Sequence, residues 1–422
     1  MLIKKNNIFQ AKIIISLFLY STLILGFFFN EDSLGGAIND YNYHLPIVLA
    51  FKKNISDTLL IFGSNEMIAR NSPFFYIILG YISKFVENID LIRLANVHII
   101  LIIIIIFYKS LKIKFYYVKK EILYLISVAF FLSPTLRSLS IWPYPLIYAI
   151  LFFTISIYFF LKFEKEVNNS YKYALLNILF LAISSYFTPN FCFFSIFFFL
   201  KFFEKYKFTW RIYTLIILNF LFGLPAILFL LKKKFFFFEY DVAGINFLDK
   251  INIANKIILI STIIFFHLLP FLFIIIKKIN LLKKKFISII IIYFISIIFF
   301  NFPQEFNGGG GIAFHLSNFL IKNNFLLFLI FFISLIYLNE VMQKSKYNCL
   351  LIILLLIPYN LQFSIYHKYF EPIIFIIFFL LKKKLINKNY FKFKNIFYFY
   401  LFQIFYLTLS LCKDFIYNFK IQ

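Results

Sequence analysis

Long apolar runs alternate with short polar connections along the whole chain. The apolar segments lie near 10–29, 73–86, 92–108, 121–133, 146–161, 173–187, 190–203, 211–231, 257–276, 286–300, 325–338, 349–365, 372–381 and 396–411. A bilayer core about 30 Å thick accepts helices of about 20 apolar residues, whereas a soluble domain could not bury so much apolar surface. The pattern predicts an all-α, polytopic integral membrane helix bundle, with residues 1–422 forming one transmembrane domain.

Basic residues between the apolar runs predict how the chain crosses the membrane. Three lysines precede or begin the first run, and residues 109–120 carry five more, so both regions are expected in the cytoplasm. Residues 30–72, which follow the first run, are then external. An odd number of crossings must separate 30–72 from 109–120, yet two apolar segments lie between them. The shorter one, 73–86, would span only about 21 Å as a helix, so we expect a re-entrant or juxtamembrane helix there.

This scheme leaves about 13 crossings and places about twice as many lysines and arginines inside as outside. It puts 277–285 in the cytoplasm and 134–145, 301–324 and 366–371 on the outer face, together with 30–72. Polar residues are concentrated in these outer segments, so they could form one external site. A transporter would instead place ionisable residues at mid-membrane, and many transporters contain two related halves, which are not visible here.

Composition narrows the classes of partner. The chain is 62% hydrophobic and has a net charge of +25, but its basic residues occur in short clusters between apolar runs. Such clusters set topology and hold lipid headgroups, so membrane lipid is the expected partner and nucleic acid is not. The three cysteines are isolated, which gives no disulfide framework and no metal cage.

The segment EDSLGGAINDYNYHLP (31–46) gathers Glu31, Asp32, Asp40 and His44 directly after the first apolar run. Asp40 and His44 are four residues apart and would share a face of a helix. A carboxylate in partly dry surroundings there could act as a general base. The alternatives are a solvated loop acid at Asp40 and interfacial caps of the first span at Glu31 and Asp32.

Cations near the outer helix ends could bind a phosphate. The candidate binding residues are Arg70, Arg137, Trp142, His367, Lys368 and Glu371. Arginine suits bidentate phosphate contacts and lysine acts as a point charge, although headgroup anchoring would use the same residues. Trp142 fits either an interfacial aromatic belt or a sugar-stacking platform. The glycine run 308–311 could offer backbone N–H groups to a phosphate, or could simply be flexible.

These features resemble the C-type glycosyltransferases, which carry acids in the first external loop. Asp40-Tyr-Asn-Tyr-His44-Leu-Pro46 is similar to the Asp-Glu-x-x-His-[Ile/Leu]-Pro motif of the dolichol-phosphate-glucose glucosyltransferases, and LIRLANV (91–97) looks like their Leu-Arg-x-x-Asn segment. NSPFFYIILGYI (71–82) lies where that family enters its next helix. Tyr41 replaces the second acid of the motif, which leaves a single-base scheme on Asp40.

The resemblance implies a multi-pass glycosyltransferase of the bacterial inner (plasma) membrane that acts on the periplasmic face. Its donor would be a polyprenyl-phosphate sugar and its acceptor a cell-envelope glycan or glycolipid. Asp40 would be the base and His44 would orient it. Glu31 and Asp32 are alternative bases, or ligands if a divalent cation is required. An envelope polysaccharide polymerase or flippase, and a solute transporter, remain as alternatives.

Overall fold

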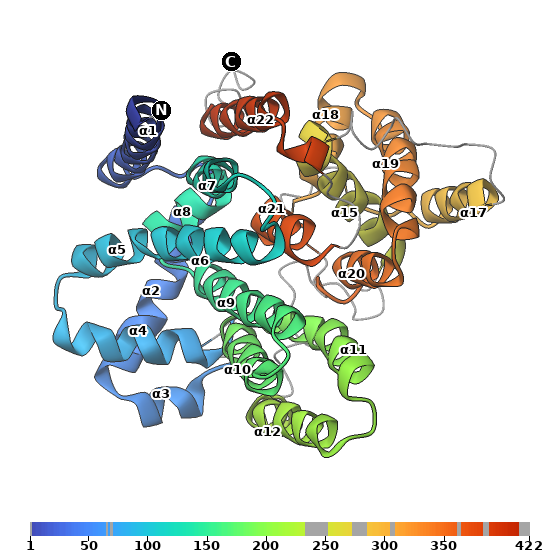
Figure 1. Cartoon of the computed structure of the whole chain (residues 1–422). Coiled ribbons are helices and arrows are strands. Elements are labelled where there is room, and N and C mark those ends of the chain that lie inside the picture. The colour runs from blue at the N-terminus through green and yellow to red at the C-terminus, as the bar shows by residue number, and fades with distance from the viewer. Residues whose placement is uncertain are drawn as a thin grey trace. The chain divides into compact units, whose positions relative to one another are not determined.

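The computed structural model describes residues 2–64, 66–67, 71–232, 252–271, 285–303, 309–360, 364–382 and 388–412 (Figure 1). Over these residues every regular element is a helix, and β-pairing is limited to isolated bridges. The predicted all-α class is therefore confirmed. Arg70 lies outside the described residues.

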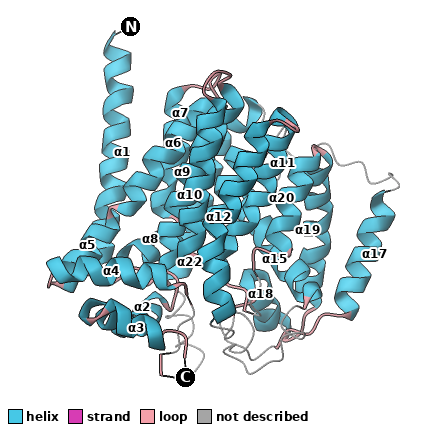
Figure 2. Ribbon diagram, turned by 90° about the horizontal axis from the view of Figure 1, so that it is seen from below, coloured by secondary structure: helices cyan, strands magenta, loops and turns pink. Residues whose placement is uncertain are grey.

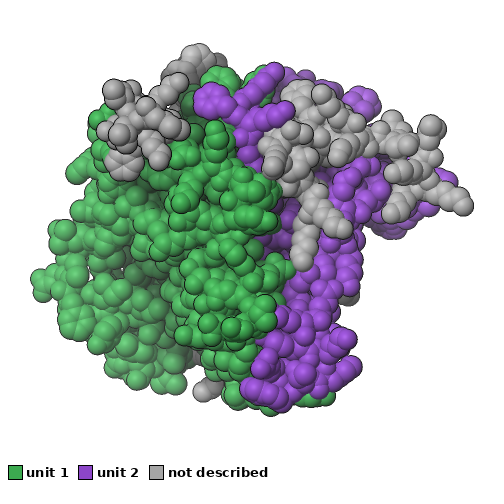
Figure 3. All heavy atoms as spheres, viewed as in Figure 1, with its two compact units in different colours: residues 1–189, 213–233, 396–422 green, residues 190–212, 234–395 purple. Residues whose placement is uncertain are grey.

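Two compact units divide the chain (Figure 3). The first contains residues 1–189, 213–233 and 396–422, and the second contains 190–212 and 234–395.

The first unit carries the N-terminal half of the chain and the C-terminal helix. In Figure 2, α9 and α10 run upright while α4 lies crosswise at their lower end. Its helices are α1 (Leu2–Phe28), α2 (Ala37–Lys53), α3 (Ile55–Ile61), α4 (Pro73–Phe85), α5 (Ile89–Val97), α6 (Ile99–Lys114), α7 (Lys120–Val128), the 3₁₀ turn η1 (Ala129–Leu132), α8 (Pro134–Ile141), α9 (Pro145–Lys165), α10 (Ser170–Phe187), most of α12 (Trp210–Lys232) and most of α22 (Phe393–Leu411).

Helices α2 and α4 pack unusually closely, because Gly80 has no side chain. A Cβ atom at Gly80 would lie 2.8 Å from Cβ of Phe51 and 3.0 Å from the backbone nitrogen of Lys52. The segment 30–72, predicted as an external loop, thus contains two helices, and α2 is fixed to the short apolar helix expected at 73–86.

Helix α8 occupies the segment that we predicted to be an external connection at 134–145. The chain bends by 61° between Lys120–Leu132 and Pro134–Ile141. Pro134 fits the first turn of α8, where its missing N–H costs nothing, and the Ser133 side chain accepts a hydrogen bond from the Leu136 N–H. All eight residues of α8 are buried, so this segment is part of the core.

The second unit is also helical. Within it α15 packs against α18, α19 and α21, and α11 packs against α20. Its elements are η2 (Pro189–Phe193), α11 (Phe194–Tyr206), α15 (Ile253–Leu268), η3 (Leu269–Phe271), α17 (Lys285–Ile298), α18 (Gly311–Ile321), α19 (Phe325–Gln343), α20 (Lys346–Leu356), α21 (His367–Ile376), the π-helical turn η4 (Ile377–Leu381) and η5 (Lys388–Phe391).

Among the described residues, five helical stretches are long and apolar enough to cross a membrane. They are Ile89–Lys114, Pro145–Lys165, Trp210–Phe229, Ile253–Phe271 and Phe325–Gln343, and the bent pair around Ser133 would make a sixth. The structure thus supports a multi-pass membrane protein but not the 13 predicted crossings. Several predicted spans are helices of only 10–17 residues, namely Lys12–Phe28, Phe286–Ile298 and Lys346–Leu356.

Candidate functional site

Glu31, just beyond the end of α1, forms a buried ion pair with Arg137 on α8. Nε of Arg137 donates to Oε1 of Glu31 at 2.7 Å, and Nη2 donates to Oε2. The two side chains are 7% and 4% exposed. Nη1 donates to the Thr22 hydroxyl and the Phe131 carbonyl, and Nη2 also donates to the Thr22 carbonyl. All five N–H donors of the guanidinium are therefore used within the protein.

This bonding changes the predicted role of Arg137. A donor that binds phosphate has to present N–H groups to it, and those of Arg137 already hold Glu31 and the backbone of α1. We therefore assign Arg137 and Glu31 to the framework of the site instead of to phosphate binding and catalysis.

Gly26 makes room for this ion pair. A Cβ atom at Gly26 would lie 2.3 Å from Oε2 of Glu31 and 3.1 Å from Nη2 of Arg137. Because real Cβ atoms do not approach that closely, the pair can lie against α1 only where the helix has no side chain.

Asp32 caps the N-terminus of α2. One alternative from the sequence was that Asp32 caps the first span. It does cap a helix, but that helix is α2 and not α1. Its carboxylate accepts hydrogen bonds from the N–H groups of Gly36 (2.8 Å), Ala37 (3.0 Å) and Ile38 (3.3 Å). Gly35 and Gly36 have φ values of 66° and 145°, so the turn into α2 requires the freedom of glycine. The negative charge also complements the positive end of the helix dipole.

Trp142 also contacts the segment between α1 and α2. Its indole N–H donates to the Glu31 carbonyl at 2.9 Å, and its ring lies 3.9 Å beneath the guanidinium of Arg93. Trp142 is only 7% exposed, so it forms part of the core and not an open stacking platform. Arg93 also binds Asp90 at 2.9 Å and the side chain of Asn30 at 3.0 Å.

The two polar residues of the LIRLANV segment (91–97) have structural roles that the sequence alone did not indicate. Besides the Arg93 contacts, Asn96 donates from its side-chain amide to the carbonyls of Leu139 (3.0 Å) and Ser140 (2.6 Å) on α8. Both side chains are buried. Burying an arginine or an asparagine in an apolar run costs free energy unless its polar groups are hydrogen-bonded. The presence of these two residues in such a run was therefore the signal that they have buried partners.

His44 lies in an aromatic pocket between α2 and α4. Its Nδ1 is 2.6 Å from the Tyr76 hydroxyl and its Nε2 is 3.3 Å from the side-chain amide of Asn71. The rings of Tyr43, Phe75 and Tyr144 surround it, and 4% of the residue is exposed. Both ring nitrogens therefore bond to residues next to or on α4, which makes His44 a packing residue of the α2–α4 contact.

Asp40 lies in the first turn of α2 and is half-buried. Its backbone N–H donates to the Gly36 carbonyl at 3.0 Å, which closes that turn. The neighbouring phenol of Tyr41 packs against Trp142 at 5.5 Å between ring centroids, and burial raises the pKa of Tyr41 while Arg93 opposes the shift. Asp40 is thus presented from a helix that is fixed at its N-terminus by Asp32 and along its side by α4 and Trp142.

In the second unit, His367 belongs to a chain of hydrogen bonds. Its Nε2 accepts from the N–H of Ile312 at 2.9 Å, and its Nδ1 is 3.1 Å from Nε2 of His267. Because a backbone N–H can only donate, neutral His367 carries its proton on Nδ1 and donates it to His267. The first turn of α18, which could have bound a phosphate, is capped here by a histidine.

Glycines 309–311 allow this arrangement. All three have positive φ, and Gly310 donates to the Ile365 carbonyl at 2.9 Å. A Cβ atom at Gly309 would lie 2.1 Å from that carbonyl oxygen, and one at Gly311 would lie 3.3 Å from Nε2 of His367. The described part of the glycine run therefore serves close backbone packing.

Lys368 and Glu371 share α21 with His367. Lys368 is half-exposed, with its ammonium 5.3 Å and 5.7 Å from the ring centroids of Tyr366 and Tyr369, whereas Glu371 is fully buried. These residues lie in the second unit, and the acids of segment 31–46 lie in the first. Over the described residues there is no group of three or more histidine, cysteine or acidic side chains placed to hold a metal ion.

No protein-family model, no curated protein and no solved structure matches the chain.

Proposed function

We propose that the protein is a membrane glycosyltransferase that transfers a sugar from a polyprenyl-phosphate donor to a glycan or glycolipid acceptor. The proposal places it in the bacterial inner membrane with its site toward the periplasm. The observation that supports it is the fixed framework around Asp40. Glu31, Asp32 and Trp142 position the start of α2, and this helix holds the half-buried Asp40 in its first turn, where we assign it the role of base.

In the proposed reaction the Asp40 carboxylate takes the proton of the acceptor hydroxyl. The acceptor oxygen forms a bond to the anomeric carbon as the bond from that carbon to the phosphate oxygen breaks, and the phosphate leaves with the electron pair. The leaving phosphate is already anionic, so it needs a cation and not a general acid.

Substitution of Asp40 tests the proposal. Asp40→Asn keeps size and hydrogen bonding but removes basicity, so transfer should fall by roughly 10²–10⁴-fold. The assay is mass spectrometry of envelope glycolipids from cells that lack the protein, complemented by each variant at equal membrane abundance. Glu87→Gln, which changes an exposed acid of the same unit, is the matched control and should behave as wild type. Near-normal transfer by Asp40→Asn would remove Asp40 as the base.

A solute transporter is the second candidate, and one observation favours it. His267 lies fully buried within the candidate span Ile253–Phe271 and is bonded to His367. Ionisable residues inside a membrane span often mark a proton or solute path. A His267→Gln variant that keeps normal glycolipids but loses proton-coupled uptake in vesicles would support transport over transfer.

A further inference from the structure

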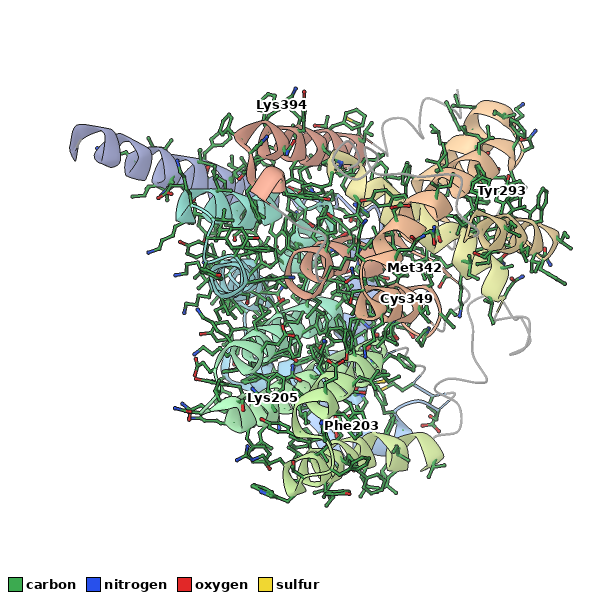
Figure 4. All side chains as sticks on the ribbon, turned by 45° about the vertical axis from the view of Figure 1, so that its right-hand side comes forward. Phe203, Lys205, Tyr293, Met342, Cys349 and Lys394 are labelled. Atoms are coloured by element: carbon green, nitrogen blue, oxygen red, sulfur yellow. The ribbon has the colours of Figure 1, made fainter. Side chains whose placement is uncertain are left out.

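A cavity of about 620 Å³ opens between α11 and α20 in the second unit. Its wall comes from the last two turns of α11 with the residues that follow, and from the first turns of α20. Phe203, labelled in Figure 4, is one of the residues that line it. The lining residues are Leu200, Phe203, Glu204, Lys207, Phe208, Lys346, Tyr347 and Leu350.

The lining contains both an apolar surface and charged groups. Four of the eight lining residues are leucine or phenylalanine, and one carboxylate lies among them with two lysines. Glu204 binds Lys201 at 3.2 Å and Lys346 at 3.0 Å. Lys207 adds a further positive charge to the lining. The cavity is therefore amphipathic, and its charged part is positive overall.

Two of the lysines occupy positions that a helix alone would not favour for lysine. Lys207 ends α11 with φ 47° and ψ −131°, a backbone conformation that suits glycine. Lys346 is the first residue of α20, where the helix dipole repels a cation. A strained backbone such as that of Lys207 is found most often at ligand-binding and functional sites.

We propose that this cavity binds an anionic glycerophospholipid. The lipid phosphate is held by Lys207 and Lys346, and the upper part of an acyl chain lies against Phe203, Phe208 and Leu350. Basic pockets between membrane helices take anionic headgroups in this way, while the apolar wall gives the chain a surface that a free phosphate would not use. The site is separate from the proposed reaction at Asp40 and does not depend on it.

Native mass spectrometry of the purified full-length chain in detergent provides the test. Phosphatidylglycerol, phosphatidylcholine and glycerol 3-phosphate are titrated separately, and bound adducts are counted. We expect one saturable phosphatidylglycerol adduct that phosphatidylcholine does not match. The double variant Lys207→Gly/Lys346→Ala should bind phosphatidylglycerol roughly 30-fold more weakly, from about 1 kcal/mol for each lysine.

Three further variants separate a binding defect from a folding defect. Lys207→Gly alone removes a cation while relieving the backbone, so it should bind more weakly without unfolding at a lower temperature. Leu350→Trp places an indole ring where the acyl chain would lie and keeps every charge, so it should also weaken the adduct. Lys205→Ala changes an exposed lysine of the same helix, labelled in Figure 4, and should bind as wild type.

Several results would overturn the proposal. Equal binding of phosphatidylcholine would remove the role of charge, and full competition by glycerol 3-phosphate would indicate a phosphate site instead of a lipid site. A loss with Lys205→Ala as large as that with the double variant would show that binding follows net charge alone. Unchanged binding by Leu350→Trp would exclude the cavity.

Discussion

Removing the charge of Glu31 should strongly destabilise the first unit. In Glu31→Gln, one amide oxygen can still accept from Arg137, but the new NH₂ group faces a guanidinium nitrogen, which is also a donor. The guanidinium then lies buried, with its side chain 4% exposed, and has no opposite charge in the pair. Breaking a buried ion pair costs about 3–5 kcal/mol, and because Gln keeps one acceptor we expect the lower end, about 3 kcal/mol.

Unfolding in mixed detergent micelles, followed by helical circular dichroism, would measure the change in free energy. Glu31→Gln/Arg137→Leu removes both charges, so it should cost clearly less than the sum of its two single variants. Gly26→Ala tests the same pair without changing a charge, because the new Cβ would collide with Glu31 and Arg137. Glu87→Gln again serves as the exposed control. A loss below about 0.5 kcal/mol for Glu31→Gln would refute the reasoning, since surface changes are of that size.

Three other outcomes follow from the structure. Gly80→Ala should destabilise the protein by about 1–3 kcal/mol because its Cβ would overlap α2, whereas Gly223→Ala, with the nearest atom 4.0 Å away, should stabilise it by about 0.5–1 kcal/mol; unfolding of both variants in parallel checks this. The Tyr347 hydroxyl and two lysines lower the pKa of Glu204 to about 2, so its stabilising contribution is complete above pH 4.5 and is lost as pH falls toward 2. Glu204→Gln should therefore flatten the acid side of the unfolding profile, and an unchanged profile would contradict that origin. Tyr116→Cys, in a chain without its native cysteines, should resist an impermeant maleimide in intact cells if 109–120 is cytoplasmic, and labelling from outside would overturn the topology.

Hydrophobic patterning predicted the helical class and the short helix at 73–86 because both depend on local composition. It also singled out the start of α2, where acids and glycines interrupt the apolar run. The 13 predicted crossings are not confirmed over the described residues, because phenylalanine and isoleucine are frequent even in helices too short to span a bilayer. Apolarity alone does not reveal the bend at Ser133 either, and for that reason α8 was expected to be an external connection.

The roles of individual charged residues depended on partners far away in the sequence. Glu31 and Arg137 are 106 residues apart, and His367 contacts His267 across 100 residues. Each residue fitted a functional role by itself, and only its neighbours in space show whether its hydrogen-bonding groups are already used. Asp32 differs, because its partners lie four to six residues ahead, within reach of local capping rules.

The distance along the chain between Glu31 and Arg137 also constrains the order of assembly. At about 5–20 residues per second, a ribosome needs roughly 5–20 s to add the intervening segment, so Glu31 is made long before its partner exists. An unpaired carboxylate has a high free energy in lipid. We therefore expect the end of α1 to remain in contact with water until α8 is synthesised. Docking of α8 then draws the start of α2 into its final place. Nascent chains stalled before residue 130 should accordingly expose Glu31 to a water-soluble carbodiimide, and chains long enough for α8 to have left the ribosome should protect it.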